Sequence, residues 1–312
     1  MQIFYSIKDL KKNKNTVLTL GTFDGIHPGH LKIIGRLVSC SKEKGCRSVV
    51  ITFYPHPRTI LGNDNSVKML TTQEEKIELL EKLGVENLLI INFTKEFASL
   101  SAEDFIYDYL INGIGLTEIV LGHDHHFGKG RRGNAELLQK IADKEGFIVT
   151  KAEAFMIDGE AVSSTKIRNA LAEGDIIRAN KLLGRNYEFS GIVVGGDKRG
   201  RELGFPTANI KLSSQEKLLP ASGVYAVKVM VENERHTGLL SIGNRPTFYN
   251  QGELVSEVYI YDFNREIYGA KVTTELVERL RGEVKFNSAE ELINQMNTDK
   301  ENGYKIFNKL NN

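Results

Sequence analysis

The stretch from Gly21 to His30, Gly-Thr-Phe-Asp-Gly-Ile-His-Pro-Gly-His, constrains the fold of this chain more than any other. The residues before it, 16–20, are β-branched and apolar, which is typical of a buried strand. Apolar residues at helical spacing follow it over residues 31–38. Gly21 and Gly25 allow a tight turn, and Pro28 suits the first turn of a helix, where no amide hydrogen is needed. The sequence therefore predicts a strand that turns directly into a helix.

The start of this helix is a predicted anion site. Its first backbone amides have no acceptor within the helix, and the helix dipole adds partial positive charge there. His27 and His30 add two side-chain donors. The simpler alternative is a pair of structural histidines beside a helix cap. The turn is neither a P-loop nor a Gly-x-Gly-x-x-Gly turn. It resembles the signature of the nucleotidyltransferase superfamily, whose members transfer AMP or CMP to a phosphate acceptor and place both histidines on the triphosphate.

Length and charge limit the class of protein. The chain has 312 residues, which suits two domains, and its formal net charge of +1 gives no global attraction to nucleic acid or to an anionic membrane. Cys40 and Cys46 show no metal-ligand spacing, and two thiols fit a reducing compartment. The first residues do not resemble a signal peptide, and no apolar run is long enough to span a bilayer. We therefore expect a cytoplasmic protein that binds small-molecule substrates, with a monomer as the default.

Residues 16 to about 150 alternate between strand-like and helix-like stretches. The expected strands are residues 16–20, 47–53, 87–92, 117–121 and 147–151, and the expected helices are residues 72–83, 101–112 and 134–144. This alternation predicts an α/β domain with a parallel sheet covered on both faces, of the Rossmann-like kind. Ligands of such sheets bind at the carboxyl ends of the strands.

Three further loops fit a nucleotide site at that edge. Residues 52–57 follow the second strand, and residues 122–133, which are rich in glycine, histidine, lysine and arginine, follow the fourth. Residues 163–168, Ser-Ser-Thr-Lys-Ile-Arg, open a helix where hydroxyls and cations can hold a phosphate. The plain alternative for this last segment is N-capping.

The second of these loops contains three histidines, His123, His125 and His126. One interpretation is that these histidines bind a metal ion, but they lack the acidic or cysteine partners of a closed metal site. A flexible loop that faces a polyphosphate is the favoured interpretation.

The pattern changes after residue 184. A pair of helices within residues 170–183, broken at Gly174 and Asp175, closes the first half. Short strand patterns follow at residues 189–194, 223–231, 236–242, 254–261 and 271–280. They predict a small antiparallel β-barrel. A final helix is expected at residues 288–297, with Ser288 as its cap. We expect domains at residues 1–184 and 185–312.

The predicted barrel has its own chemical centre. The basic, glycine-rich loop 195–201 suits phosphates. Thr207 and Asn209 lie two residues apart, so on an extended segment they face the same way and offer oxygen ligands to a hard cation such as Mg²⁺. An ordinary turn is the alternative. Glu257 lies within a strand suited to burial, where it is either a solvated edge residue or the base that activates an alcohol.

Two sequence blocks of this half resemble the riboflavin kinase family: Gly-x-x-x-Gly-Phe-Pro-Thr-Ala-Asn at residues 200–209 and Glu-Val-x-Ile-x-Asp-Phe at residues 257–263. From about residue 16 to 300 the chain resembles the bacterial bifunctional riboflavin kinase/FMN adenylyltransferases, also called FAD synthetases. The resemblance implies that the barrel phosphorylates riboflavin with ATP to give FMN. The α/β domain would then adenylylate FMN with a second ATP to give FAD and pyrophosphate.

The resemblance also implies the site residues. Catalytic roles fall to Glu257, His27 and His30. ATP binding in the adenylyltransferase domain is implied for Gly21, Phe23, Asp24, Gly25, His27, His30, Gly122, Asp124, Ser164, Thr165 and Arg168. Flavin and ATP binding in the kinase domain is implied for Gly195, Gly200, Arg201, Gly204, Phe205, Pro206, Thr207, Asn209, Asn244 and Arg281. Thr207 and Asn209 match Mg²⁺ ligands that act together with the ATP phosphates.

Three positions depart from the pattern of the family. Gly195 stands where many relatives carry a larger polar residue, Ala161 where some carry arginine, and Tyr54 where an acidic residue is common. None removes a group on which the chemistry depends. We expect Lys129, Arg131 or Arg132 to compensate for the cation missing at position 161.

Three other functions stay open at this point. A transferase that acts on another phosphorylated acceptor, such as phosphopantetheine, would not need the kinase half. A flavin sensor that binds without turnover would not need a base at Glu257. A chain with only one active half is the third.

Overall fold

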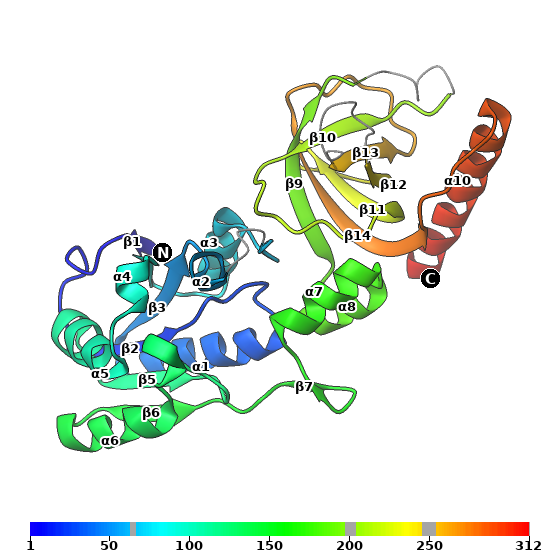
Figure 1. The fold of residues 1–312 in the computed structure, drawn as a ribbon. Coiled ribbons are helices and arrows are strands. Elements are labelled where there is room, and N and C mark those ends of the chain that lie inside the picture. The colour runs from blue at the N-terminus through cyan, green and yellow to red at the C-terminus, as the bar shows by residue number, and fades with distance from the viewer. Residues whose placement is uncertain (63–66, 197–203, 245–253, 312) are drawn as a thin grey trace. The chain divides into compact units, whose positions relative to one another are not determined.

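The structure is a computed structural model of the 312-residue chain, and it describes residues 1–62, 67–196, 204–244 and 254–311. The chain divides into two compact units, residues 1–164 and 165–312 (Figure 1). Each unit has the fold class expected from the sequence.

The first unit is built on a parallel sheet of six strands. The strands are β1 (Gln2–Phe4), β2 (Thr16–Leu20), β3 (Arg47–Tyr54), β4 (Asn87–Asn92), β5 (Glu118–Leu121) and β6 (Ile148–Lys151). Their order is β1-β4-β3-β2-β5-β6, and every neighbouring pair is parallel. The strand order reverses between β2 and β5. In sheets of this type a ligand binds at such a reversal, outside the carboxyl ends of the strands.

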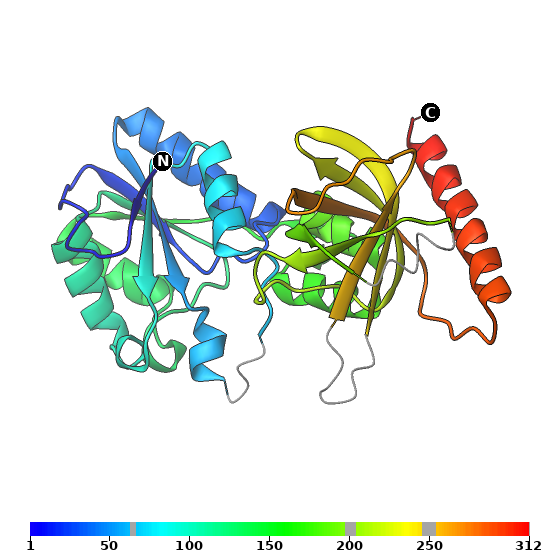
Figure 2. The same ribbon diagram turned by 90° about the horizontal axis from the view of Figure 1, so that it is seen from above.

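Helices cover both faces of this sheet (Figure 2). They are α1 (Pro28–Lys44), α2 (Pro57–Leu61), α3 (Gln73–Lys82), α4 (Lys95–Ala98), α5 (Ala102–Asp104), the π-helix η1 (Phe105–Ile114), the 3₁₀ turn η2 (Lys129–Arg131) and α6 (Ala135–Glu145). A two-stranded hairpin, β7 (Met156–Ile157) and β8 (Glu160–Ala161), completes the unit.

The alternation of side chains along each strand creates two separate cores. Val17 of β2 points to a core shared with α1 and α3, whereas its neighbour Leu18 points to a core shared with η1 and α6. Val50 and Ile51 of β3 divide in the same way. A strand buried on both faces must be apolar at successive positions, which is why these strands read as continuous hydrophobic runs.

The second unit is a closed barrel with helices outside it. It contains α7 (Ser164–Glu173, which begins at the last residue of the first unit), α8 (Ile176–Leu183), β9 (Tyr187–Val194), β10 (Ala208–Leu212), β11 (Gly223–Val231), β12 (Glu234–Asn244), β13 (Leu254–Ile260), β14 (Lys271–Arg281) and α10 (Ala289–Asn311). The strand order is β10-β13-β12-β11-β14-β9, and all pairs are antiparallel. Closure removes the exposed sheet edges that an open antiparallel sheet would have.

The last helix is longer than the sequence predicted. We expected it to end at residue 297, but α10 continues to Asn311. The polar run 298–303 interrupts the apolar pattern, and this hides the continuation. Tyr304 and Phe307 beyond it pack against Tyr261 at the end of β13, and this tertiary contact stabilises the last turns.

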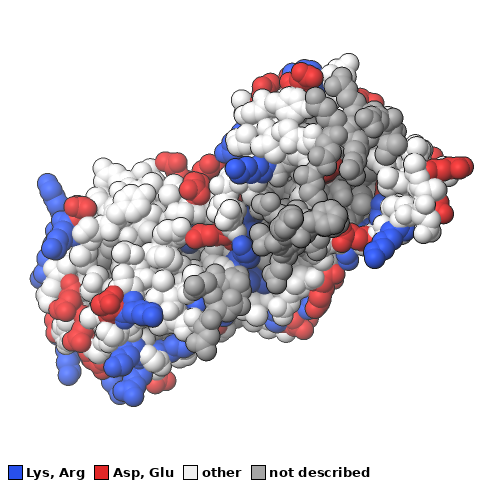
Figure 3. All heavy atoms as spheres, turned by 45° about the horizontal axis from the view of Figure 1, so that its top comes forward, with Lys and Arg blue, Asp and Glu red and all other residues white. Residues whose placement is uncertain are grey.

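Two features of the surface bear on partners. No helix in the described part of the chain is long and apolar enough to cross a membrane. On the face shown in Figure 3, both acidic and basic side chains occur among the uncharged ones.

Candidate active sites

The turn after β2 has an unusual backbone. Phe23, Gly25 and Ile26 have φ values of 46°, 89° and 39°. Positive φ is strained for an aromatic or a β-branched residue, and such strain persists only where the surroundings hold it in place. Gly21 lies beneath the ring of Phe23, and a Cβ on this residue would come within 3.1 Å of that ring. The tight turn predicted from the glycines is therefore present.

Asp24 holds this turn to a distant loop. Its carboxylate accepts hydrogen bonds from the backbone amides of Leu70 and Thr71 at 3.2 and 3.1 Å. Gly25 donates its amide to the hydroxyl of Thr71 at 3.1 Å. Asp24 is only 1% exposed. The sequence placed Asp24 in an ATP-binding set, whereas the structure gives its carboxylate two backbone partners 46 and 47 residues along the chain.

The helix α1 begins as the sequence predicted. His27 is its N-cap, Pro28 occupies the first turn, and the side chain of His27 makes no capping hydrogen bond. The rings of His27 and His30 stack with centroids 3.7 Å apart, and the edge of Phe23 meets His30 at 5.3 Å. Both predicted histidines thus lie together at the start of α1.

His30 is held in its neutral form. Burial, the neighbouring His27 and the charge of Lys76 together lower the pKa of His30 well below its ordinary value. The Nδ1 atom of His30 is buried and has no hydrogen-bond partner among the described residues. A neutral imidazole can donate one hydrogen bond and accept another. His30 therefore suits contact with a phosphate oxygen through a hydrogen bond, and it adds no full positive charge.

The loop after β5 lies on the other side of the strand reversal. A Cβ on Gly122 would come within 3.2 Å of Ile33 of α1, so this loop passes close to that helix. Asp124 is exposed and lies 3.6 Å from the ring of His123. His125 stacks on Phe127 with centroids 5.9 Å apart. Among the described residues, no group of three or more histidine, cysteine or acidic side chains is arranged to hold a metal ion.

Ser164 joins the turn from the opposite end of the unit. Its hydroxyl donates to the backbone carbonyl oxygen of Asp24 at 2.8 Å. Thr165 and Arg168 follow on α7, in the second compact unit, and they stay predictions as triphosphate ligands. In the first unit the structure therefore brings together Gly21, Phe23, Asp24, Gly25, His27, His30 and Ser164.

An aromatic cluster near the same edge was not anticipated. It links Phe53 at the end of β3 with Phe93 after β4 and continues through Phe97, Phe105 and Phe127, with neighbouring centroids 5.5–5.9 Å apart. The sequence signal was an aromatic residue at or just after the end of each of two strands. That signal does not distinguish a ligand-binding face from ordinary core.

The barrel brings together three residues of its predicted centre. The hydroxyl of Thr207 donates to a carboxylate oxygen of Glu257 at 3.1 Å. Asn209 of β10 lies directly opposite Glu257 of β13 in the antiparallel register, and Ser241 of β12 lies opposite it on the other side. Directly opposite residues of antiparallel strands point to the same face. Glu257 is half-buried and is part of a polar row on this face.

The oxygen atoms at this centre suit a hard divalent cation. Thr207 offers a hydroxyl and Asn209 an amide carbonyl, and Mg²⁺ prefers such oxygen ligands. The hydroxyl of Thr207 donates its proton to Glu257 and still has lone pairs available for an ion. A Cβ on Gly196 would come within 2.1 Å of the amide of Asn209, so a larger residue here would displace that side chain from its present position.

The structure describes some of the remaining predicted kinase residues and leaves others undescribed. Gly204 has a φ of 82°, and Phe205 is buried with its ring 5.3 Å from Tyr259. Pro206 and Gly195 are exposed. Gly200 and Arg201 lie outside the described residues, and Asn244 is described only by its backbone at the end of β12.

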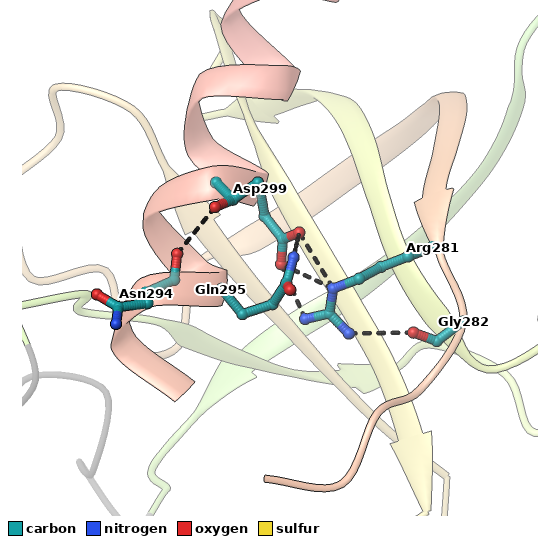
Figure 4. A network of polar contacts seen from close by, with 6 residues as sticks. Arg281, Gly282, Asn294, Gln295 and Asp299 are labelled. Atoms are coloured by element: carbon teal, nitrogen blue, oxygen red, sulfur yellow. Dashed lines mark hydrogen bonds and ion pairs between the residues drawn. The ribbon is translucent and has the colours of Figure 1, made fainter. Parts of the chain in front are cut away.

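Arg281 has a partner that the sequence did not suggest. Its guanidinium faces Asp299 of α10, and Gln295 donates to the same carboxylate at 2.9 Å (Figure 4). A further nitrogen of Arg281 donates to the carbonyl of Gly282 at 3.0 Å. We expected Arg281 to bind flavin or ATP, and that role stays a prediction beside this structural one.

Comparison with known proteins matches both halves. The FAD synthetase family model matches residues 9–166, and the riboflavin kinase family model matches residues 183–307. The bifunctional riboflavin kinase/FMN adenylyltransferase of Bacillus subtilis is 41% identical over 304 residues, which cover 96% of this chain and 95% of that protein. Its counterpart in Listeria monocytogenes is 42% identical over 297 residues, covering 95% and 94%.

A solved structure has the same fold over nearly the whole chain. It is described as a macrolide-efflux protein from Streptococcus pneumoniae, is 33% identical and superimposes with a TM-score of 0.88, covering 96% of this chain and 97% of that one. The FAD synthetase model matches the part of the chain with the parallel sheet, and the riboflavin kinase model matches the part with the barrel. Relatives that align over nearly the full length are about 40% identical. The chain therefore belongs to the family of bifunctional riboflavin kinase/FMN adenylyltransferases.

Proposed function

We propose that this chain converts riboflavin to FMN in the barrel and FMN to FAD in the α/β unit, with ATP as the donor in both steps. One observation carries the proposal: the chain contains two polar centres of different chemical kind. The barrel centre has a strand carboxylate beside a hydroxyl and an amide. The α/β centre has two stacked imidazoles at the N-terminus of a helix.

The kinase step needs a base because an alcohol is a weak nucleophile. The 5′-hydroxyl of the ribityl chain gives its proton to the carboxylate of Glu257 as its oxygen attacks the γ-phosphorus of ATP. The bond from that phosphorus to the bridging oxygen breaks, and ADP leaves. The hydrogen bond from Thr207 orients the carboxylate for this transfer.

The adenylyl transfer needs no base. The second pKa of a phosphate monoester is about 6, so the phosphate of FMN is already ionised at neutral pH. Its oxygen attacks the α-phosphorus of ATP, the bond to the pyrophosphate oxygen breaks, and FAD and pyrophosphate result. His27, His30, Thr165 and the first amides of α1 would align the phosphates through hydrogen bonds, and Arg168 would supply positive charge. Ser164 would contribute by holding the turn through its hydrogen bond to the carbonyl of Asp24. The partly exposed rings of Phe53 and Phe97 offer the flavin an apolar surface.

Thr207 and Asn209 would hold Mg²⁺, or another divalent cation, against the ATP phosphates of the kinase site. Such an ion supplies positive charge to the phosphate oxygens. We place the functional boundary near residue 184, because α7 carries three of the proposed adenylyltransferase residues and α8 follows it directly. We also propose a cytoplasmic location, in keeping with the two free cysteines.

A product analysis tests both steps. The purified chain is incubated with riboflavin, ATP and MgCl₂, and the flavins are separated by chromatography over time. The proposal predicts that FMN forms first and FAD follows. If no FMN forms, the kinase role is wrong, and if FMN accumulates without FAD, the adenylyltransferase role is wrong.

The same analysis separates the other candidate functions. A transferase for another phosphorylated acceptor would leave riboflavin unchanged while it consumed ATP with that acceptor. A flavin sensor would bind riboflavin or FMN without producing ADP or pyrophosphate.

A further inference from the structure

A lysine that the mechanism above does not use lies within the first unit. Lys76 belongs to the first turns of α3, yet its side chain points inward and the residue is only 6% exposed. An ammonium group loses much of its hydration when it is buried, and this loss costs free energy. Lysines are therefore seldom buried unless a specific interaction offsets that cost. The other lysine of this helix, Lys82, is exposed.

The position of α3 is fixed relative to the turn after β2. Asp24 binds the amides of Leu70 and Thr71, and Thr72 then caps α3 through a reciprocal pair of hydrogen bonds with Glu75. Lys76 is the next residue. The first turn of α3 is therefore held to the strained turn through a short series of hydrogen bonds.

The ammonium group lies at the carboxyl edge of the sheet. Its Nζ atom is 3.5 Å from the hydroxyl of Thr52, which is fully buried near the end of β3. That hydroxyl donates to the backbone carbonyl of Thr22 in the turn at 3.3 Å. Lys76 thus reaches beneath the turn that leads into α1, on the side of the sheet where a ligand of this fold binds.

The charge of Lys76 also acts on His30. It is one of the causes that lower the pKa of His30, so the ammonium lies within electrostatic reach of that ring. Since His30 is held neutral, the positive charge of this pair of residues comes from Lys76 and not from His30. A triphosphate bound at the start of α1 would interact with this charge.

We propose that Lys76 binds the triphosphate of ATP in the adenylyltransferase site and neutralises the pyrophosphate as it leaves. This proposal rests on the proposed adenylyl transfer. In that step the bond between the α-phosphorus and the pyrophosphate oxygen breaks, and negative charge accumulates on the leaving oxygens. In this step Lys76 exchanges no proton with the substrates and acts only through its charge and its hydrogen bonds. A cation at this point stabilises the transition state more than the ground state.

Three variants of Lys76 separate charge from hydrogen bonding. Lys76→Met removes both, Lys76→Gln keeps a donor for Thr52 without the charge, and Lys76→Arg keeps the charge. Lys82→Met makes the same chemical change on the exposed side of the same helix and serves as the matched control. Circular dichroism and thermal unfolding of each variant report whether the first unit, which carries Lys76, is folded. The riboflavin kinase activity, which we assign to the barrel, serves as an internal standard for the amount of active protein.

The measurement is the rate of FAD formation from supplied FMN as a function of ATP concentration, with inhibition by inorganic pyrophosphate as a second readout. We expect Lys76→Met and Lys76→Gln to lower kcat/KM for ATP by about 10²-fold and to weaken inhibition by pyrophosphate. Lys76→Arg should retain a substantial part of the kcat/KM for ATP and of the inhibition by pyrophosphate. Lys82→Met should match the wild type in both quantities.

Two results would overturn the proposal. One is wild-type kcat/KM for ATP in Lys76→Gln, since the lysine would then serve only as a donor to Thr52. The other is lowered activity with unchanged inhibition by pyrophosphate, which would mean a purely structural role. If the wild-type chain itself made no FAD from FMN, the proposed function would fail, and this outcome is distinct from both.

Discussion

The guanidinium of Arg281 on β14 donates to both carboxylate oxygens of Asp299 on α10, with three nitrogen–oxygen distances of 2.8–3.1 Å. Asp299 is almost fully buried, and Phe286 lies over the guanidinium at 5.8 Å. This pair fastens the C-terminal helix to the barrel. The sequence could show neither the pairing nor the full length of that helix.

Asp299→Ala should destabilise the second unit strongly. It leaves the guanidinium of Arg281 without its partner in a poorly solvated position, which typically costs about 3–5 kcal/mol. Lys305→Ala on the same helix removes only an exposed contact with Asn302 and should change the free energy of unfolding by less than about 0.5 kcal/mol. Chemical denaturation of both variants checks this. Equal stability of the two would show that the pair contributes nothing.

Asp24→Ala should lower the rate of adenylyl transfer and leave the rate of riboflavin phosphorylation unchanged. Its carboxylate holds the amides of Leu70 and Thr71, and each buried amide left without an acceptor costs about 1–3 kcal/mol. The turn that carries His27 would shift, and a displacement of about 1 Å can lower a rate by about 10²-fold. Asp24→Asn keeps one acceptor oxygen and should therefore lose less adenylyl-transfer activity than Asp24→Ala. The rates of FMN and FAD formation are measured separately, and an equal loss in both would contradict a local effect.

His30→Ala should stop the reaction at FMN. The imidazole is held neutral and is partly buried at the start of α1, so its loss removes a hydrogen-bonding group that we propose contacts the phosphates. We expect FAD formation to fall by about 10²–10³-fold, with riboflavin phosphorylation unchanged. Chromatography of the flavins after incubation with riboflavin and ATP provides the test. Continued FAD formation at the wild-type rate would exclude a role for His30 in adenylyl transfer.

His125 should make the first unit sensitive to acid. Burial, together with His126 and Arg131, lowers the pKa of His125 to about 4. In the unfolded chain its pKa is about 6.5. Between these two values the unfolded chain binds more protons than the folded one, so stability falls as the pH drops from about 6.5 toward 4.

His125→Phe removes this contribution and keeps the contact with Phe127. The melting temperature of the variant should fall less than that of the wild type between pH 7.5 and pH 5. His30 acts in the same direction in both proteins, so the difference reports His125 alone. His123→Phe, at an exposed position, is the control. Identical pH profiles of wild type and His125→Phe would contradict the prediction.

The parts of the fold that depend on local sequence were predictable. The strand, turn and helix around His27 follow from β-branched residues, two glycines and a proline within a short stretch, and each acts on its immediate neighbours. Strands β2 to β6 of the parallel sheet and most barrel strands were found for the same reason, whereas the short strand β1 was not predicted. Thr207 and Asn209 were placed on an extended segment, and the structure adds that this segment continues as β10.

The features that were missed depend on distant contacts. The role of Asp24 requires amides 46 and 47 residues away. The last turns of α10 are stabilised by Tyr261, far earlier in the chain. Lys76 looks like an ordinary surface lysine in the sequence, and only the packing of α3 on the sheet turns it inward. A single sequence carries no signal for such contacts, because they depend on which surfaces meet after folding.

The account depends on two separate centres that use ATP differently, and Glu257→Gln tests this most directly. The variant is supplied either with riboflavin or with FMN, each together with ATP and MgCl₂. We predict that FMN formation from riboflavin falls by about 10²–10⁴-fold, because the base is lost. Supplied FMN should still be converted to FAD at the wild-type rate. Undiminished phosphorylation of riboflavin, or an equal loss of both reactions, would contradict the account.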